Sequence, residues 1–194
     1  MGSVKALLPW GDHTLLEAWV ERFRQAGCER ILVVLGHQSA AIRNAVSPNL
    51  PVTWLVNEQA ADTGPRESLL LALDQLSEGD CAWFTPVDVP VVAATTLATI
   101  ERAFVEAAAA DTPLAAIPKH GAQTGHPVLA GPDFLERLSE GERGDRIDAI
   151  FSWATRRLLH VDVDDLSVLG NMNRPADYRA FAPGIGGPDK EPST

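Results

Sequence analysis

Hydrophobic positions along the chain follow two different periods. Between Thr14 and Ala26, apolar residues recur at the three- and four-residue spacing of an amphipathic helix, and residues 31–35 then form a continuous apolar run. Such a run is typical of a strand buried on both faces. The same alternation continues to residue 181. It predicts a Rossmann-like α/β fold, a three-layer α/β/α sandwich with a mostly parallel sheet.

The expected elements follow from this pattern. Strands are expected at residues 30–35, 52–56, 81–85, 114–117, 127–130 and 158–163. Helices are expected at residues 14–26, 39–46, 64–76, 95–110, 132–138, 147–156 and 175–181.

The first helix carries clear end signals. Thr14 is a good N-cap, and Glu17 three residues later can complete a capping box. Gly27 is a natural stop. These signals make this helix the best-defined element of the sequence.

Length and composition predict a single domain over residues 1–182. The chain has 194 residues, of which 45% are hydrophobic and 22% are charged, as in ordinary globular proteins. Residues 183–194 are rich in proline and glycine, so we expect a disordered tail there.

The formal net charge of −10 argues against nucleic-acid binding, which usually needs a basic surface. No apolar run is long enough to span a membrane, and the first residues do not read as a signal peptide. The two cysteines, Cys28 and Cys81, make neither a disulfide framework nor a spaced metal site. We therefore expect a cytoplasmic protein without a membrane or nucleic-acid partner.

Asp88 is the first candidate for chemistry. It follows an apolar strand and lies between Pro86 and Pro90, and ligands of open α/β sheets bind beyond the carboxyl ends of strands. A carboxylate there can hold Mg2+. The alternative is a turn aspartate that bonds its own backbone.

Other candidates have a structural alternative as well. Lys5 alone reads as a solvated lysine, and Asn173 alone as the N-cap of a helix with Pro175 near its start. His126 can donate to a phosphate or sense pH, but a histidine before a proline is often a structural loop residue. Gly64 before Pro65 reads as a helix start.

Several motifs occur in the order found in MobA-like nucleotidyltransferases. Met1-Gly2-Ser3-Val4-Lys5-Ala6-Leu7-Leu8-Pro9 resembles the M-G-x-x-K-x-L-L-P of that family's nucleotide loop, and residues 86–90 (P-V-D-V-P) resemble its P-x-D-x-P motif. Residues 171–177 resemble its D-I-D-T-P-E-D motif or the N-x-N-T-P variant of that motif, and residues 125–127 resemble its G-H-P motif. Asn57, Gly64 and Ser68 resemble the segment that follows the third strand of the cytidylyltransferase branch.

The resemblance implies a fold like that of nucleotide-diphospho-sugar transferases and a role for each motif. Gly2, Lys5, Asn57, Gly64 and Ser68 would bind the nucleotide, Gly125 and His126 the acceptor, and Asp88 and Asn173 the catalytic Mg2+. The implied catalytic residues are Lys5 and Asp88.

The implied activity is transfer of a nucleotidyl group to a phosphorylated acceptor, with release of pyrophosphate. CTP is the first choice of donor and GTP the second, and molybdopterin is the favoured acceptor. The family's opening strand and first loop glycines have no counterpart in the printed residues. We therefore expect a weakened or rearranged sheet. A catalytically impaired or regulatory nucleotide-binding relative is the alternative.

Overall fold

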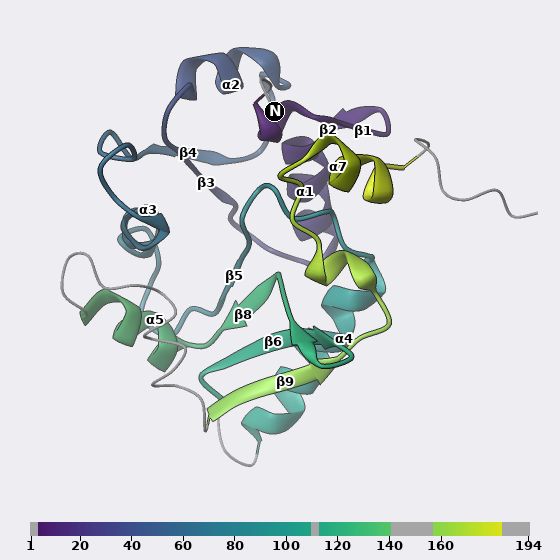
Figure 1. Ribbon diagram of the computed structural model, residues 1–194. Coiled ribbons are helices and arrows are strands. Elements are labelled where there is room, and N and C mark those ends of the chain that lie inside the picture. The colour runs from purple at the N-terminus through teal and green to yellow at the C-terminus, as the bar shows by residue number, and fades with distance from the viewer. Residues whose placement is uncertain (1–3, 110–112, 141–156, 184–194) are drawn as a thin grey trace, which may run out of the picture.

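The computed structural model describes residues 4–109, 113–140 and 157–183 (Figure 1). Its helices are α1 (Leu15–Gln25), α2 (Ser39–Ala45), α3 (Pro65–Leu73), α4 (Ala94–Ala108), α5 (Pro132–Glu140) and α7 (Pro175–Phe181), with the 3-10 turns η1 (Lys5–Leu7) and η3 (Leu166–Leu169). Its strands are β1 (Pro9–Trp10), β2 (His13–Thr14), β3 (Leu32–Leu35), β4 (Thr53–Val56), β5 (Ala82–Phe84), β6 (Ala115–His120), β7 (Gln123–Thr124), β8 (Val128–Ala130) and β9 (Leu158–Asp162).

The larger sheet is mostly antiparallel, so the prediction of a mostly parallel sheet is wrong for the described strands. Its order is β5-β8-β6-β7, and β9 pairs with β6 in parallel. The β5–β8, β6–β8 and β6–β7 pairs are antiparallel. Only residues 121–127 connect β6 to β8, and a parallel crossover needs about a dozen residues or more.

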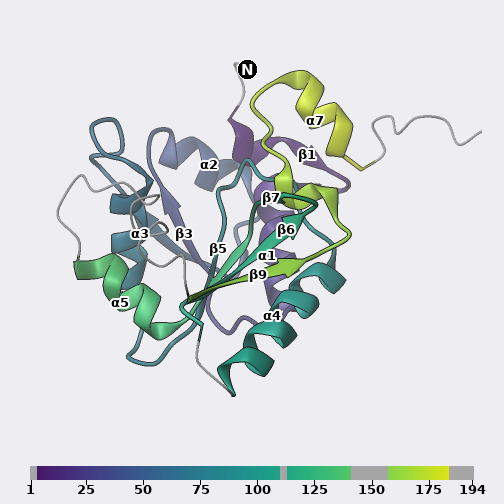
Figure 2. The same cartoon turned by 60° about the horizontal axis from the view of Figure 1, so that its bottom comes forward.

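The larger sheet lies between two helix layers, with α4 on one side and α3 and α5 on the other (Figure 2). Ala116 and Leu129 pack against α4, whereas Ala115 and Val128 belong to a cluster that includes α5 and is packed by α3. Side chains of successive strand residues point to opposite faces, which produces this division. The three-layer α/β/α arrangement is therefore present around the larger sheet.

Strands β3 and β4 form a second, separate sheet. They pair in parallel from Leu32 opposite Thr53 to Leu35 opposite Val56. Within the described residues, neither strand pairs with β5 or with any other strand of the larger sheet. Helices α1 and α2 pack on β3 through a cluster that includes Leu16, Leu35 and Ile42. The single central sheet expected from the sequence is thus divided in two.

The predicted capping box of α1 is present. The backbone N–H of Glu17 donates to Thr14 Oγ1 at 3.2 Å, and the backbone N–H of Thr14 donates to Glu17 Oε2 at 2.8 Å. The other carboxylate oxygen of Glu17 accepts from the backbone N–H of Ser47 at 2.8 Å, just after α2. One glutamate therefore starts α1 and ties it to the end of α2.

Two sequence predictions fall outside the described residues. These are the helix at 147–156 and nearly all of the predicted tail, residues 184–194. Across the described ranges, no helix combines the length and apolar character that crossing a membrane requires.

Removing the cap should measurably weaken the fold. We expect Thr14→Ala to lower the free energy of unfolding by about 1 kcal/mol, because an unpaired backbone donor is left at the start of α1. Chemical denaturation checks this value. Thr95→Ala, at an exposed position in the first turn of α4, is the matched control and should change it by less than about 0.5 kcal/mol. Equal effects of the two variants would contradict the capping role.

Candidate active site

The segment around Asp88 is anchored from two sides. The indole N–H of Trp19 in α1 donates to the carbonyl of Val89 at 2.9 Å, and the backbone N–H of Met172 donates to the carbonyl of Asp88 at 2.8 Å. Val89 and Pro90 are buried. The flanking residues therefore hold the backbone in place, while the side chain of Asp88 stays partly exposed at 21%.

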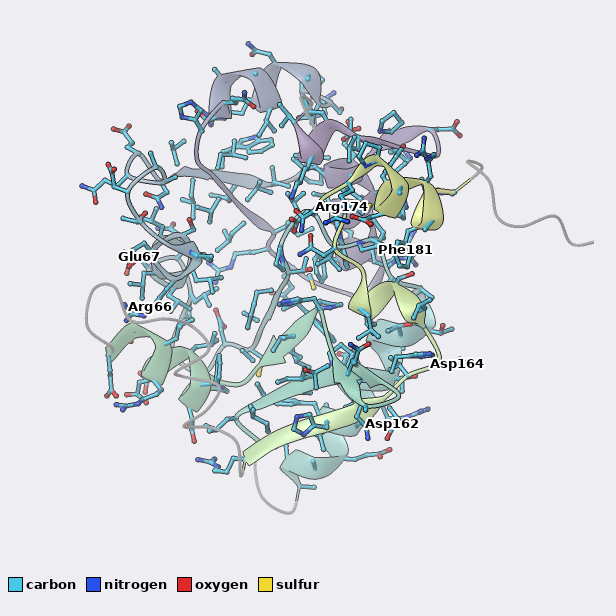
Figure 3. The ribbon with its side chains drawn as sticks, in the orientation of Figure 1. Arg66, Glu67, Asp162, Asp164, Arg174 and Phe181 are labelled. Atoms are coloured by element: carbon cyan, nitrogen blue, oxygen red, sulfur yellow. The ribbon has the colours of Figure 1, made fainter. Side chains whose placement is uncertain are left out.

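Three predicted side chains meet at this position. The ammonium of Lys5 lies 2.8 Å from Asp88 Oδ2 and also donates to Asn173 Oδ1. Lys5 is the first residue of the turn η1. Ala6 in the same turn and Leu8 directly after it are both buried. Asn173 precedes Arg174, the N-cap of α7 that is labelled in Figure 3. The structure thus brings together Lys5, Asp88 and Asn173, as the sequence predicted.

The donor atoms suit a hard divalent cation. Asp88 supplies a carboxylate and Asn173 an amide oxygen, and both converge on one positive charge, the ammonium of Lys5. No group of three or more His, Cys, Asp or Glu side chains able to hold a metal occurs in the parts of the chain that are described. Such a sparse set fits Mg2+, which keeps several waters and takes further ligands from substrate phosphates.

His126 lies close enough to Asp88 for the two side chains to interact electrostatically. Burial lowers the pKa of the imidazole, and the negative charge of Asp88 partly opposes this shift. Nδ1 is buried and has no hydrogen-bond partner among the described residues, while the ring packs edge-on against Phe84 in β5. A lowered pKa keeps the imidazole neutral near pH 7, so one ring nitrogen can donate and the other accept.

The backbone beside His126 touches the segment that leads to Asn173. The N–H of His126 donates to the carbonyl of Val168 at 2.9 Å. A Cβ on Gly125 would lie 1.9 Å from that same carbonyl oxygen, so this contact requires glycine. The G-H-P segment and the turn η3 are therefore in direct contact.

Asp165 anchors η3, and the sequence analysis missed it. Its carboxylate accepts from Thr96 Oγ1 at 2.6 Å and from the backbone N–H groups of Ala93 and Ser167 at 2.9 and 3.0 Å. Burial alone would raise the pKa of this carboxyl, but these hydrogen bonds outweigh burial and lower it. The available signal was an aspartate two residues before a serine, the pattern of an Asx turn.

The predicted nucleotide-side residues form a second group. The amide nitrogen of Asn57 donates to Thr63 Oγ1 and Ser68 Oγ, both at 3.1 Å, and its oxygen accepts from the backbone N–H of Gln59. Gly64 is the N-cap of α3, and its N–H donates to Glu67. Asn57, Gly64 and Ser68 thus shape the loop after β4. Among the described residues, no hydrogen bond joins these three residues to Lys5 or Asp88.

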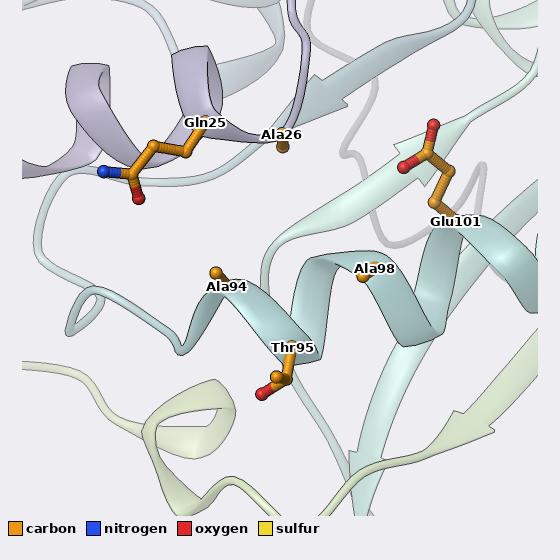
Figure 4. Close-up of a pocket in the computed structure, with 6 residues that line it drawn as sticks. All are labelled: Gln25, Ala26, Ala94, Thr95, Ala98 and Glu101. Atoms are coloured by element: carbon orange, nitrogen blue, oxygen red, sulfur yellow. The ribbon is translucent and has the colours of Figure 1, made fainter.

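The pockets of the described structure include two open ones. One of about 320 Å3 lies at the carboxyl ends of β3 and β4 and includes His37, Asn57 and Glu58 in its lining. The other, of about 340 Å3, lies between the end of α1 and the start of α4 (Figure 4). Its lining is Gln25, Ala26, Ala94, Thr95, Ala98 and Glu101. Only the first pocket contains a predicted site residue.

One predicted nucleotide ligand, Gly2, lies outside the described residues. Asp88 and Asn173, which were predicted to share one site, both contact the ammonium of Lys5. Gly125 and His126 lie next to that site. Both contact the carbonyl of Val168, and the charge of Asp88 acts on the imidazole of His126. The roles of all these residues remain predictions.

Residues 1–158 match the model of one domain family, described as the MobA-like NTP transferase domain. Among curated proteins, the bifunctional protein GlmU of Aromatoleum aromaticum is 31% identical over 99 residues. Those residues are 51% of this chain but only 21% of GlmU. The chain therefore spans about a fifth of that relative.

Solved structures of similar size share the fold. Rv0371c of Mycobacterium tuberculosis H37Rv, solved in complex with manganese, is 25% identical with a TM-score of 0.67, and the match covers 93% of this chain and 92% of that one. A nucleotidyl transferase from Methanothermobacter, Mth528, is 26% identical with a TM-score of 0.74, covering 92% and 83%. The architecture is therefore a nucleotidyltransferase α/β fold.

Neutralising Asp165 should loosen η3. We expect Asp165→Asn to lower the free energy of unfolding at pH 7 by about 1–2 kcal/mol, because a partly exposed carboxylate loses charge-assisted hydrogen bonds. A carboxyl whose pKa is lowered by folding stabilises the fold above its unfolded pKa, about 3.9. The difference between wild type and variant should therefore shrink as the pH falls below about 4.

Denaturant titrations at pH 7 and at pH 3.5 measure this difference. Asp164→Asn is the matched control, because Asp164 is the exposed neighbour labelled in Figure 3 and its side chain makes no hydrogen bond with the described residues. A variant of Asp165 as stable as that control at pH 7 would contradict the anchoring role.

Proposed function

Because the chain belongs to the MobA-like NTP transferase domain family, we propose that it transfers a nucleotidyl group from a nucleoside triphosphate to a phosphorylated acceptor. An oxygen of the acceptor phosphate attacks the α-phosphorus. The bond from that phosphorus to the oxygen bridging the α- and β-phosphates breaks, and pyrophosphate leaves. The observation that carries the proposal is the convergence of Asp88 and Asn173 oxygens on a single positive charge.

The two oxygen ligands would hold Mg2+ or Mn2+. A bound divalent cation neutralises phosphate charge and orients the reacting groups. Asp88 is suited to this task because Met172 and Trp19 hold the backbone carbonyls of residues 88 and 89, while the carboxylate of Asp88 is partly exposed. The manganese bound to Rv0371c, a protein 25% identical to this chain, supports a divalent cation as the partner of this site.

Lys5 and His126 would handle the charge of the substrates. The Lys5 ammonium is a point charge that can stabilise the phosphates and the departing pyrophosphate. His126, with a lowered pKa, offers a neutral imidazole, and its backbone N–H is bonded to the carbonyl of Val168. This arrangement supports binding of the acceptor phosphate next to the metal.

The sequence motifs indicate which nucleotide and which acceptor this site favours. Asn57 and Ser68 order the loop after β4, with the pocket of about 320 Å3 beside it, and this loop would accept the base. The Ser68-Leu69 and G-H-P motifs favour CTP, with GTP second. Molybdopterin is the favoured acceptor, on the family resemblance alone.

A non-catalytic nucleotide-binding or regulatory relative is the second candidate. Its support is the single carboxylate of the site, because Asn171 and Asn173 replace the acidic residues of the family motif. Nucleotide binding without turnover would favour this candidate over the transferase.

Asp88→Asn should abolish metal-dependent nucleotide binding and leave the fold intact. Thermal shift with CTP and GTP, each with and without Mg2+, tests this, because a ligand at a hundred times its Kd stabilises the native state by about 2.7 kcal/mol. Wild type should show a shift that needs Mg2+, and Asp88→Asn should show none. Asp74→Asn, at an exposed position just after α3, should behave as wild type.

Two results would contradict the proposal. An Mg2+-dependent shift that survives in Asp88→Asn removes Asp88 from the metal site. A variant that melts far below wild type without ligand marks Asp88 as a structural residue.

A further inference from the structure

The ammonium of Lys5 stands where a divalent cation would bind. It contacts Asp88 Oδ2 at 2.8 Å and Asn173 Oδ1, the two oxygens that suit a metal. We infer that Lys5 and the divalent cation exclude one another from this position, and that the ammonium moves to the nucleotide phosphates when the cation binds. The inference rests on the proposed function, because it takes its cation and nucleotide from that site.

Shared ligands make joint occupancy unfavourable. Mg2+ needs its oxygen ligands at about 2.0–2.1 Å in near-octahedral geometry, so it would use the lone pairs that now accept from the ammonium. Two positive charges against one carboxylate would also repel each other. Asp88 is the only carboxylate that contacts Lys5 in the described ranges, so no second negative charge offsets this repulsion.

The side chain of Lys5 can leave while its backbone stays in place. The turn η1 is held by buried Ala6 and by Leu8, whose carbonyl accepts from the N–H of Leu15 at 2.8 Å. The Lys5 side chain itself is 32% exposed, and a lysine has a flexible four-carbon stem. Exchange therefore requires a rotamer change rather than a rearrangement of the fold.

The displaced ammonium needs a new partner. Among the described residues, its two hydrogen bonds are both with ligands of the cation site, so the cation alone would remove them. The phosphates of a nucleotide would replace them and would also supply ligands to the cation. Metal and nucleotide should therefore bind cooperatively, and the metal should bind weakly alone.

Mn2+ binding to the full chain tests the exchange without measuring turnover. Free Mn2+ is followed by electron paramagnetic resonance during titration of wild type, Lys5→Met, Lys119→Met and Asp88→Asn, each alone and with CTP or GTP, corrected for the Mn2+–nucleotide complex. Lys119→Met is the matched control, because it removes the same charge from an ion pair with Asp162. Thermal melts establish that each variant is folded.

Lys5→Met should bind Mn2+ alone more tightly than wild type, by a factor in the range of about 5 to 150 that is usual for coupled sites. Lys119→Met should match wild type, and Asp88→Asn should lose binding. Nucleotide should tighten Mn2+ binding in wild type and do so much less in Lys5→Met.

If Lys5→Met binds Mn2+ alone no tighter than Lys119→Met, while nucleotide still recruits Mn2+ in a manner that requires Asp88, the exchange is refuted and the proposed function stands. If no variant binds Mn2+ even with nucleotide, the proposed function fails, and the inference fails with it.

Discussion

The site depends on how firmly the backbone at residues 86–90 is held. Val89 is fixed by the Trp19 indole and Asp88 by the N–H of Met172, so helix α1 and the segment before α7 meet on the same few residues. The chain at Gly170 also packs directly on Pro90, since a Cβ at residue 170 would lie 2.4 Å from a carbon of that proline. Because hydrogen bonds hold this backbone from two sides, the partly exposed carboxylate of Asp88 has a defined orientation, as binding of a metal or phosphate requires.

Local signals predicted the elements of this protein well. The Thr14 and Glu17 capping box, the stop at Gly27 and the start of α3 at Pro65 all appear where their sequence chemistry places them. These features involve residues three or four apart, so the sequence contains both partners of each interaction. Pairings between distant segments, such as that of Met172 with Asp88, have no such local signature, and only the resemblance to a family placed Lys5, Asp88 and Asn173 together.

The sheet was the part predicted least well. Apolar runs indicate that strands are buried, but they do not state which neighbours pair or in which direction. The mostly parallel prediction followed from the alternation of helices and strands. The short connection between β6 and β8 reverses the chain within the sheet, and β3 with β4 remains a separate parallel pair. The hydrogen bonds between Asp165 and the start of α4 were missed for a related reason, because the partners Ala93 and Thr96 lie about seventy positions away in the sequence.

The contact of Gly125 with Val168 joins the G-H-P segment directly to the turn η3. Because no side chain fits between them, and because the N–H of His126 is bonded to the same carbonyl, displacing the G-H-P segment must displace η3. Four residues later the chain supplies the Met172 N–H that holds Asp88. Val168 and Met172 thus form a short backbone path from His126 to Asp88, so both residues are supported by the same segment of chain.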